Sequence, residues 1–247
     1  MNTAPLKTPP AEPPLSVLMY HQFGHFARPK AHRAQFCDSA RFGSQLAYLR
    51  RMGFDVMSLE SARQALFEGA ALPRRGVVLT VDDGYQNFAD HAWPALQAQG
   101  MPATVFIVTS LVGRKSEWLQ GFAEQPPLMD APTLRRLRRE GVHFGSHSLT
   151  HPRLSRLAPE QMRAEIFDSK AALEDLLGEA VTDFCYPYGD YDERARDYVR
   201  EAGYRTGLTC IRGKANGARS PFDIPRKAIS WGDNLLGFAW KLHFKHD

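Results

Sequence analysis

The sequence predicts a single-domain α/β protein built on a parallel β-sheet. Short apolar runs alternate with stretches in which apolar residues recur at helical spacing, which is the pattern of repeated βα units. With 247 residues, of which 43% are hydrophobic, the chain is long enough to bury one large core. Open doubly wound sheets and barrels both fit this pattern. Side chains that could take part in catalysis or metal binding follow at least four of the predicted strands, and this recurrence favours a barrel.

Strands are predicted where β-branched or other apolar residues form short runs. In chain order these runs span residues 17–20, 54–57, 77–81, 103–108, 142–144, 181–186, 206–210 and 224–229. Helices are predicted where apolar residues recur every three or four positions. In chain order they span residues 36–49, 61–69, 87–99, 133–140, 159–177, 193–202 and 235–244. Ser61 is the predicted N-cap of the second helix, and Gly53, Gly100, Gly178 and Gly203 are predicted helix stops.

The N-terminal segment differs in composition from the rest of the chain. Residues 1–14 hold five prolines among small and polar residues, and we expect a disordered tail there, followed by one folded domain at 15–247. The tail lacks the apolar core of a signal peptide, and the apolar run 15–20 is too short to provide one. No stretch approaches the ~20 apolar residues of a membrane span. These features predict a cytoplasmic protein.

Charge and cysteine content exclude several function classes. The net charge is +4, and the densest basic cluster, residues 135–139, alternates with leucines as on the solvated face of a helix. No basic stripe interleaved with aromatic residues accompanies it, so nucleic-acid binding is not expected. Cys37, Cys185 and Cys210 are odd in number and have no C-x-x-C spacing. We expect them to be buried small hydrophobic residues, and unpaired cysteines suit a reducing compartment.

Two short segments carry the strongest chemical signal. The predicted strand 77–81 ends in two adjacent carboxylates, Asp82 and Asp83, followed by Gly84. His147 and His151 follow a later strand at i and i+4, where a helical turn or a tight loop would put both imidazoles on one side. Two imidazoles and one carboxylate make a three-ligand metal site with an open position, and the second carboxylate is free to act as a base. The alternative is a simple turn beside a capping histidine.

These motifs resemble those of the polysaccharide deacetylase family, also called the NodB-homology or carbohydrate esterase family 4. Thr80-Val81-Asp82-Asp83-Gly84 resembles its first motif, Ser146-His147-Ser148-Leu149-Thr150-His151-Pro152 its second, and Phe184-Cys185-Tyr186-Pro187-Tyr188-Gly189 its third. The resemblance runs from Met19-Tyr20-His21 to about Leu242 and is nearest to a bacterial branch that opens with a Met-Tyr-His strand and closes near Pro225-Arg226. It implies a distorted (β/α)7 barrel and metal-dependent removal of acetyl groups from N-acetylated, sometimes O-acetylated, sugars.

The resemblance also implies roles for the motif residues. Asp83, His147 and His151 would bind the metal, and Asp82 would be the general base that takes a proton from the metal-bound water. Nitrogen and oxygen ligands without a thiolate favour Zn²⁺, for which Co²⁺, Ni²⁺ or Mn²⁺ could substitute. Neighbouring strand residues point to opposite faces, so the two carboxylates can share one site only if the chain bends, and Gly84 permits that bend.

The third motif departs from the family pattern. Cys185 stands where the family often has the arginine that orients the base. Arg226 on the last strand could supply the guanidinium instead; the alternative is a surface salt bridge. Tyr188 would offer its backbone N–H to the tetrahedral oxyanion, unless the segment is merely an aromatic turn.

The catalytic acid is not identified by a motif. The family's Leu-x-His is not found, and Leu242-His243 lies in the predicted C-terminal helix, where His243 is expected at the surface. His21 is the better candidate to protonate the leaving amine; the alternative is a structural hydrogen bond. The remaining histidines are assigned structural roles: His25, His32, His91, His143 and His246.

Four tryptophans divide into two pairs. Trp118 and Trp231 lie in predicted loops and could stack on a sugar ring. Trp93 and Trp240 sit at helical spacing and are expected in the core.

With an acetylated sugar or polysaccharide as its partner, the chain is interpreted as a deacetylase. The alternatives are a carbohydrate-binding protein without turnover, and a hydrolase of another non-peptide amide. A cytoplasmic location would favour a sugar precursor or a lipid-linked intermediate as substrate.

Overall fold

The computed structural model describes residues 13–29, 32–119 and 125–244. The predicted disordered tail falls almost entirely on residues 1–12, and His246 is at the other end of the chain, so both lie outside the described residues. Within the described part, no helix combines the length and the apolar character needed to cross a bilayer.

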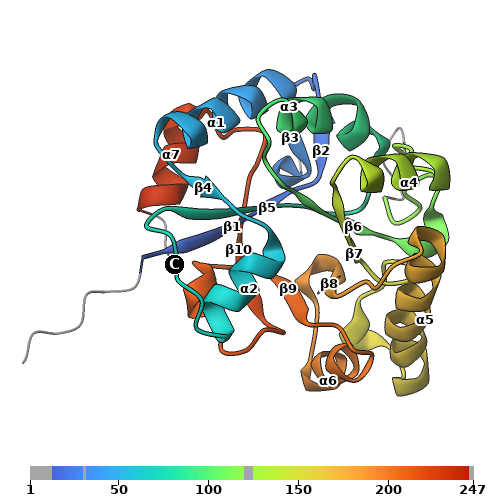
Figure 1. Cartoon of the computed structure of the whole chain (residues 1–247). Coiled ribbons are helices and arrows are strands. Elements are labelled where there is room, and N and C mark those ends of the chain that lie inside the picture. Colours follow the sequence, from blue (N-terminus) through green and yellow to red (C-terminus); the bar gives the residue numbers. More distant parts are fainter. Residues whose placement is uncertain (1–12, 30–31, 120–124, 245–247) are drawn as a thin grey trace, which may run out of the picture.

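Seven parallel strands close into a barrel (Figure 1). Their bounds in chain order are β1 Leu15–Tyr20, β5 Gly76–Val81, β6 Thr104–Ile107, β7 His143–Ser146, β8 Asp183–Cys185, β9 Thr206–Arg212 and β10 Ile224–Ala228. Strands β5 to β10 pair in sequence order, and β1 closes the ring because it pairs with β5 on one side and β10 on the other. The barrel alternative is confirmed, and the open doubly wound sheet is wrong.

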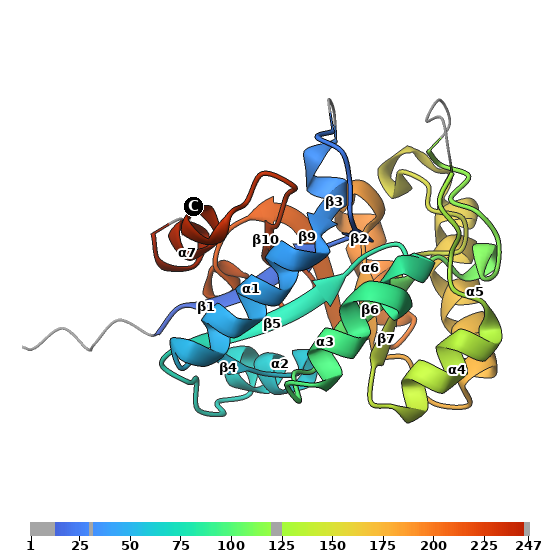
Figure 2. The same cartoon turned by 90° about the horizontal axis from the view of Figure 1, so that it is seen from above.

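Helices surround the strands (Figures 1 and 2). Their bounds are α1 Ser39–Arg51, α2 Leu59–Phe67, α3 Trp93–Gln97, α4 Ala131–Arg139, α5 Pro159–Leu177, α6 Glu193–Glu201 and α7 Leu235–His243. Side-chain oxygens cap several N-termini: Asp38 accepts from two backbone N–H groups of α1, and Asp130 from one of α4. The cap of α2 is Ser58, three residues before the predicted Ser61.

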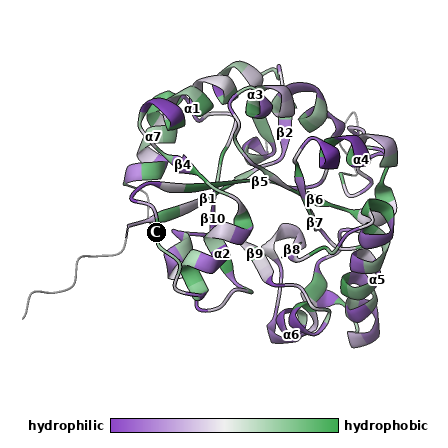
Figure 3. Ribbon diagram, in the orientation of Figure 1, coloured by the Kyte–Doolittle hydropathy of each residue, from purple (hydrophilic) through white to green (hydrophobic). Residues whose placement is uncertain are grey.

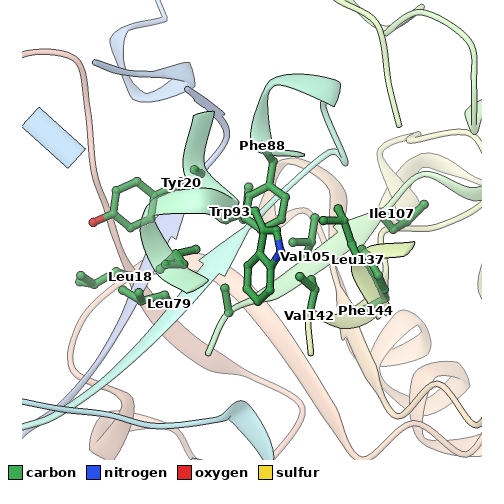
Figure 4. Close-up of a cluster of buried hydrophobic side chains, with 14 of the residues drawn as sticks. Leu18, Tyr20, Leu79, Phe88, Trp93, Val105, Ile107, Leu137, Val142 and Phe144 are labelled. Carbon is green, nitrogen blue, oxygen red and sulfur yellow. The ribbon is translucent and has the colours of Figure 1, made fainter. Parts of the chain in front are cut away.

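The two faces of the strands build two separate apolar clusters. Outward-facing strand residues pack against the helices, and Figure 4 shows part of this cluster, including Leu18, Leu79, Val105, Phe88 and Trp93. Inward-facing strand residues fill the barrel, and α2 covers the end where the strands begin. The strands contribute Leu15, Val17, Val78, Phe106, Leu208 and Ile224 to this second cluster, and α2 contributes Leu59 and Ala62. Figure 3 shows the matching hydropathy, with largely hydrophobic strands such as β1 and β5 inside helices that carry many hydrophilic residues. The carboxyl end of the barrel is therefore left for polar chemistry.

Two predicted helices differ from the observed ones. Residues Phe36–Asp38 form a short strand, β3, which pairs in parallel with β2 (Gln22–Gly24), and α1 begins only at Ser39. The helix predicted at 87–99 is divided into a π-helical segment, Phe88–Ala92, and the short α3. Pro94 has no N–H to donate, and the N–H of Trp93 bonds to the carbonyl of Phe88, five residues back. The remaining predicted strand, 54–57, is reduced to β4 (Asp55–Val56) beside β5.

Two burial predictions are wrong. Trp240 is 58% exposed because α7 buries Phe238 and Leu242, which leaves Trp240 on the opposite side of the helix. Cys210 is exposed because β9 is buried only over its first four residues. Cys37 and Cys185 are buried as predicted, and Trp93 belongs to the core.

Candidate active site

The predicted site residues gather at the carboxyl end of the barrel. Asp82 and Asp83 directly follow β5, His147 follows β7, and Cys185 ends β8. Arg226 lies within β10 and faces the barrel interior, as Ile224 does on the same strand. Because the carboxyl ends of parallel barrel strands meet at one face, residues far apart in sequence can form one site there.

The bend expected after β5 is present and begins one residue earlier than predicted. Asp83 and Gly84 both adopt left-handed backbone conformations, with φ of 76° each. Asp82 therefore continues the inward-facing series of β5, while the carboxylate of Asp83 turns toward β7. A Cβ at Gly84 would lie 2.8 Å from Cδ1 of Ile107, which would have to shift, but the left-handed backbone is what favours glycine here.

Asp83, His147 and His151 form a compact, buried group whose donor atoms lie within 4.8 Å of one another. The Nε2 atoms of both histidines are 3.4 Å from Oδ1 of Asp83. Burial by itself would raise the pKa of Asp83, but its hydrogen bonds to the two imidazoles hold that pKa well below its usual value. The group offers one oxygen and two nitrogens, which are the ligands of hydrolytic divalent-metal sites.

The orientation of His147 fits metal binding. Its Nδ1 lies 2.7 Å from the backbone carbonyl of Cys185. Because a carbonyl can only accept, Nδ1 carries a hydrogen. Nε2 donates to Asp83 while the ring is protonated, and its lone pair becomes available to a metal once that proton is lost. A second group of possible ligands consists of Asp82, His147 and Cys185. The guanidinium of Arg226 contacts both Asp82 and Cys185, and its positive charge opposes a cation there.

A glutamate that the sequence analysis did not single out shapes the histidine loop. Glu165 of α5 accepts hydrogen bonds from the backbone N–H groups of Leu149 and Thr150, both at 2.9 Å, and from the hydroxyl of Thr150. Its carboxylate thereby ties the loop between His147 and His151 to the helix. The available signal was a charged residue beside Ile166, on the apolar face of a long helix.

Asp82 is held by a buried bidentate ion pair. Nη1 and Nη2 of Arg226 donate to Oδ1 and Oδ2 of Asp82, both at 2.7 Å. The other N–H groups of Arg226 bond to the carbonyl of Thr209, the hydroxyl of Thr80 and the sulfur of Cys185, so all five donors are used. Burial would raise the pKa of Asp82, but the charge and hydrogen bonds of Arg226 lower it on balance. The contact predicted between Arg226 and the base exists; its part in catalysis stays a prediction.

His21 and Tyr188 lie at opposite edges of this group. Nε2 of His21 is 4.0 Å from Oδ2 of Asp82, and its Nδ1 has no hydrogen-bond partner among the described residues. Tyr188 has a left-handed backbone (φ 59°), and its ring centroid is 4.6 Å from that of His151. Their roles as acid and as oxyanion donor stay predictions.

The two tryptophans predicted to bind sugar have different surroundings. The ring of Trp118 stacks on His151 with centroids 4.4 Å apart, so it borders the metal-ligand group. Trp231 packs elsewhere: its indole N–H donates to the carbonyl of Phe26, and the guanidinium groups of Arg33 and Arg41 lie over its ring. These contacts give Trp231 a packing role, and its stacking on a sugar ring stays a prediction.

His243 is bonded away from the site. Its Nε2 lies 2.9 Å from the hydroxyl of Tyr48 on α1, which agrees with the prediction that it is not the catalytic acid.

Comparison with known proteins decides the family. A family model described as polysaccharide deacetylase matches residues 69–207. The chain belongs to the polysaccharide deacetylase family. The family prediction and the polysaccharide deacetylase-like hydrolase class are thus confirmed, whereas membership of the branch with the Met-Tyr-His strand stays a prediction.

Relatives in sequence support the same assignment. A putative polysaccharide deacetylase, YxkH, of Bacillus subtilis is 26% identical over 225 residues, which cover 91% of this chain and 75% of the relative. The poly-beta-1,6-N-acetyl-D-glucosamine N-deacetylase of Escherichia coli (strain K12) is 27% identical over 233 residues, 80% of this chain. The match spans only 34% of that relative's length.

Solved structures confirm the fold. The Streptococcus pyogenes deacetylase PplD, in complex with acetate, superposes with a TM-score of 0.81 at 22% identity, covering 93% of this chain and 98% of the other. IcaB from Ammonifex degensii gives a TM-score of 0.79 at 23% identity, covering 93% and 97%. The predicted NodB-type (β/α)7 barrel is therefore confirmed.

Proposed function

We propose that this protein is a divalent-metal hydrolase that removes the acetyl group from N-acetylated amino sugars in an oligosaccharide or polysaccharide. The observation that carries the proposal is the buried Asp82–Arg226 pair directly beside the Asp83, His147 and His151 group. The poly-N-acetylglucosamine deacetylase activity named for the E. coli relative supports an N-acetyl substrate.

The residues have complementary tasks in such a reaction. A divalent cation held by Asp83, His147 and His151 would supply Lewis acidity toward water and the acetyl carbonyl. Arg226 keeps the carboxylate of Asp82 ionised and fixes its plane. Oδ2 also accepts from the thiol of Cys185, whereas Oδ1 retains a lone pair that can take the proton from water. His21 is the group we assign to deliver a proton to the departing amine, so that acetate and a free amino sugar result. Because all the donors are nitrogen and oxygen, we propose zinc as the native metal.

Acetate release from N-acetylglucosamine oligomers tests the proposal. Asp82→Asn should lower the rate by at least about 100-fold, which is the contribution typical of a general base, while bound metal stays at the wild-type level. His147→Ala should lose both acetate release and metal. Asp197→Asn, on the exposed outer helix α6, is the matched control and should behave as wild type. Ordinary activity in Asp82→Asn would contradict the assigned base.

The same assay separates the alternatives. Metal-loaded wild-type protein that binds the oligomers but releases no acetate would be a carbohydrate-binding protein. Release of product only from other amides in a substrate panel would indicate a different hydrolase.

We also propose that the protein acts in the cytoplasm on a sugar precursor or a lipid-linked intermediate. Its three cysteines are free, which suits a reducing compartment. Fractionation of the source cells with an antibody tests the location, and recovery from the periplasm or the medium would contradict it.

A further inference from the structure

The C-terminal helix α7 exposes an unusual amount of apolar surface. Leu236, Trp240 and Phe244 recur every fourth residue and are 81%, 58% and 66% exposed. We call these three residues the apolar stripe. Of seven large hydrophobic side chains exposed in the described part of the chain, the stripe and the neighbouring Leu235 supply four. The rings of Trp240 and Phe244 stack with centroids 4.7 Å apart, so the stripe presents a continuous aromatic surface.

A pocket beside α7 holds more positive than negative charge. It is lined by Arg212, Lys227, Ala228 and Lys241, and we call it the cation pocket. Lys227 is only 3% exposed, and its ammonium group donates to the carbonyl of Lys241 at 2.8 Å. No carboxylate pairs with Lys227 among the described residues. Burial and the nearby charge of Lys214 lower the pKa of Lys227 to about 8.

The other cations of the pocket do not relieve this imbalance. Lys241 pairs with Asp233, so that carboxylate is already engaged. Arg212 is exposed at the end of β9 and forms no ion pair among the described residues. An ammonium group has three donors, and a buried one without a counter-ion is costly unless an anion is supplied from outside.

The stripe and the pocket adjoin on the same helix. Lys241, which lines the pocket, directly follows Trp240 of the stripe. A helix that combines exposed Trp, Phe and Leu with flanking cations is typical of binding at a bilayer interface, where the apolar side chains enter the acyl boundary and the cations meet lipid phosphates. A second copy of the chain would have to bury about 800 Å² of each partner, and it would leave the charge in the pocket unmatched unless it also offered an anion.

We propose that the apolar stripe and the cation pocket together form a surface that binds an anionic lipid bilayer. The stripe enters the headgroup region, and a lipid phosphate pairs with the exposed Arg212 at the cation pocket, where its negative charge also offsets the buried charge of Lys227. This inference does not depend on the proposed deacetylation.

Vesicle co-sedimentation of the full chain tests the proposal. Vesicles of phosphatidylcholine mixed with phosphatidylglycerol should bind the protein at least about tenfold better than phosphatidylcholine alone, and high salt should weaken the binding. Tryptophan emission should shift to shorter wavelength on binding, because Trp240 leaves water. Leu236→Gln combined with Trp240→Gln should reduce binding at least about tenfold.

Charge variants separate the pocket from general attraction. Arg212→Gln should weaken binding to the anionic vesicles about fivefold, which corresponds to about 1 kcal/mol per cation. The matched control is Arg139→Gln, on the exposed face of α4 at the other side of the barrel (Figures 1 and 2), and it should bind as wild type. Circular dichroism and thermal unfolding check that each variant is folded.

Several results would overturn the proposal. One is wild-type protein that binds neither kind of vesicle at low salt. A second is equal loss of binding in Arg139→Gln and Arg212→Gln, which would mean diffuse charge attraction. A third is wild-type protein that is a dimer and binds no vesicles, together with a stripe variant that is a monomer; this would assign the stripe to contact with a second copy of the chain. A fourth is a pocket that binds inorganic phosphate while the protein ignores vesicles.

Discussion

Replacing Arg226 by methionine removes one partner of the buried pair at the centre of the barrel. The side chains of Arg226 and Asp82 are 0% and 2% exposed, and they share two hydrogen bonds of 2.7 Å. Methionine would fill part of the space but leave the carboxylate without a counter-ion and the carbonyl of Thr209 without its donor. Breaking a buried pair in this way costs about 3–5 kcal/mol. We expect the free energy of unfolding of Arg226→Met to fall by that amount at neutral pH.

Urea unfolding of metal-free protein, followed by tryptophan fluorescence, measures this loss. At about 2–4 °C per kcal/mol for a chain of this size, the midpoint of thermal unfolding should fall by about 6–20 °C. The double variant Asp82→Asn/Arg226→Met removes the unpaired charge and should recover most of the stability. Two results would refute the reasoning. One is a loss below about 1 kcal/mol, far under the expected cost of breaking a buried pair. The other is a double variant that is no more stable than Arg226→Met.

The pH dependence of the same pair has a definite sign. Burial raises the pKa of Asp82, but Arg226 lowers it more, so the folded-state pKa lies below the unfolded one. The stabilisation is therefore fully present above the unfolded pKa and is lost as the pH falls through the folded pKa. The difference in stability between wild type and Arg226→Met should shrink in acid, and a difference that grew in acid would contradict the sign.

Three further predictions follow from packing and chemistry elsewhere in the site and barrel. Glu165→Gln should weaken zinc affinity about tenfold in a competition titration, because one amide cannot accept all three hydrogen bonds from the loop. Glu160→Gln, at an exposed position of the same helix, is the control and should bind zinc as wild type does. Equal zinc affinities of the two variants would contradict this prediction. Gly145→Ala should lower the free energy of unfolding by about 1–3 kcal/mol, because the new Cβ would lie 2.5 Å from the ring of Phe106. The control is Gly43→Ala, whose Cβ would meet nothing within 4 Å, and its free energy of unfolding should be unchanged or higher. Exhaustive chelation should abolish acetate release and added zinc should restore it, and activity that survived chelation would rule out the metal mechanism.

The barrel could be predicted from sequence because its strands have two different apolar faces. The strands that end at Tyr20 and Val81 are buried at every position and are apolar except at Ser16 and Thr80, as expected for strands covered on both sides. The three-residue strands β2 and β3 are too short to show any period, so the pattern was assigned to the helix that follows. The break near Pro94 was visible in principle, but the helical spacing of its neighbours concealed it.

The metal-ligand group was predictable because His147 and His151 are four residues apart and because Asp83, like them, follows a predicted strand. Arg226 was weighed against a surface salt bridge, since spacing cannot show that a strand 144 residues away delivers a guanidinium to Asp82. Glu165 was missed because it acts on backbone N–H groups, which carry no sequence signal. Trp240 was misplaced because helical spacing does not tell which face of α7 packs inward.

Position 185 serves its two neighbours through different atoms. His147 is oriented by the main-chain carbonyl of Cys185, which every amino acid possesses. Arg226 instead meets the sulfur, and the small side chain leaves room for the guanidinium. Substitution at this position can therefore alter how the base is held without changing the tautomer of the metal-binding histidine. A single substitution at position 185 can thus change the contacts of Arg226 and Asp82 while the orientation of His147 stays the same.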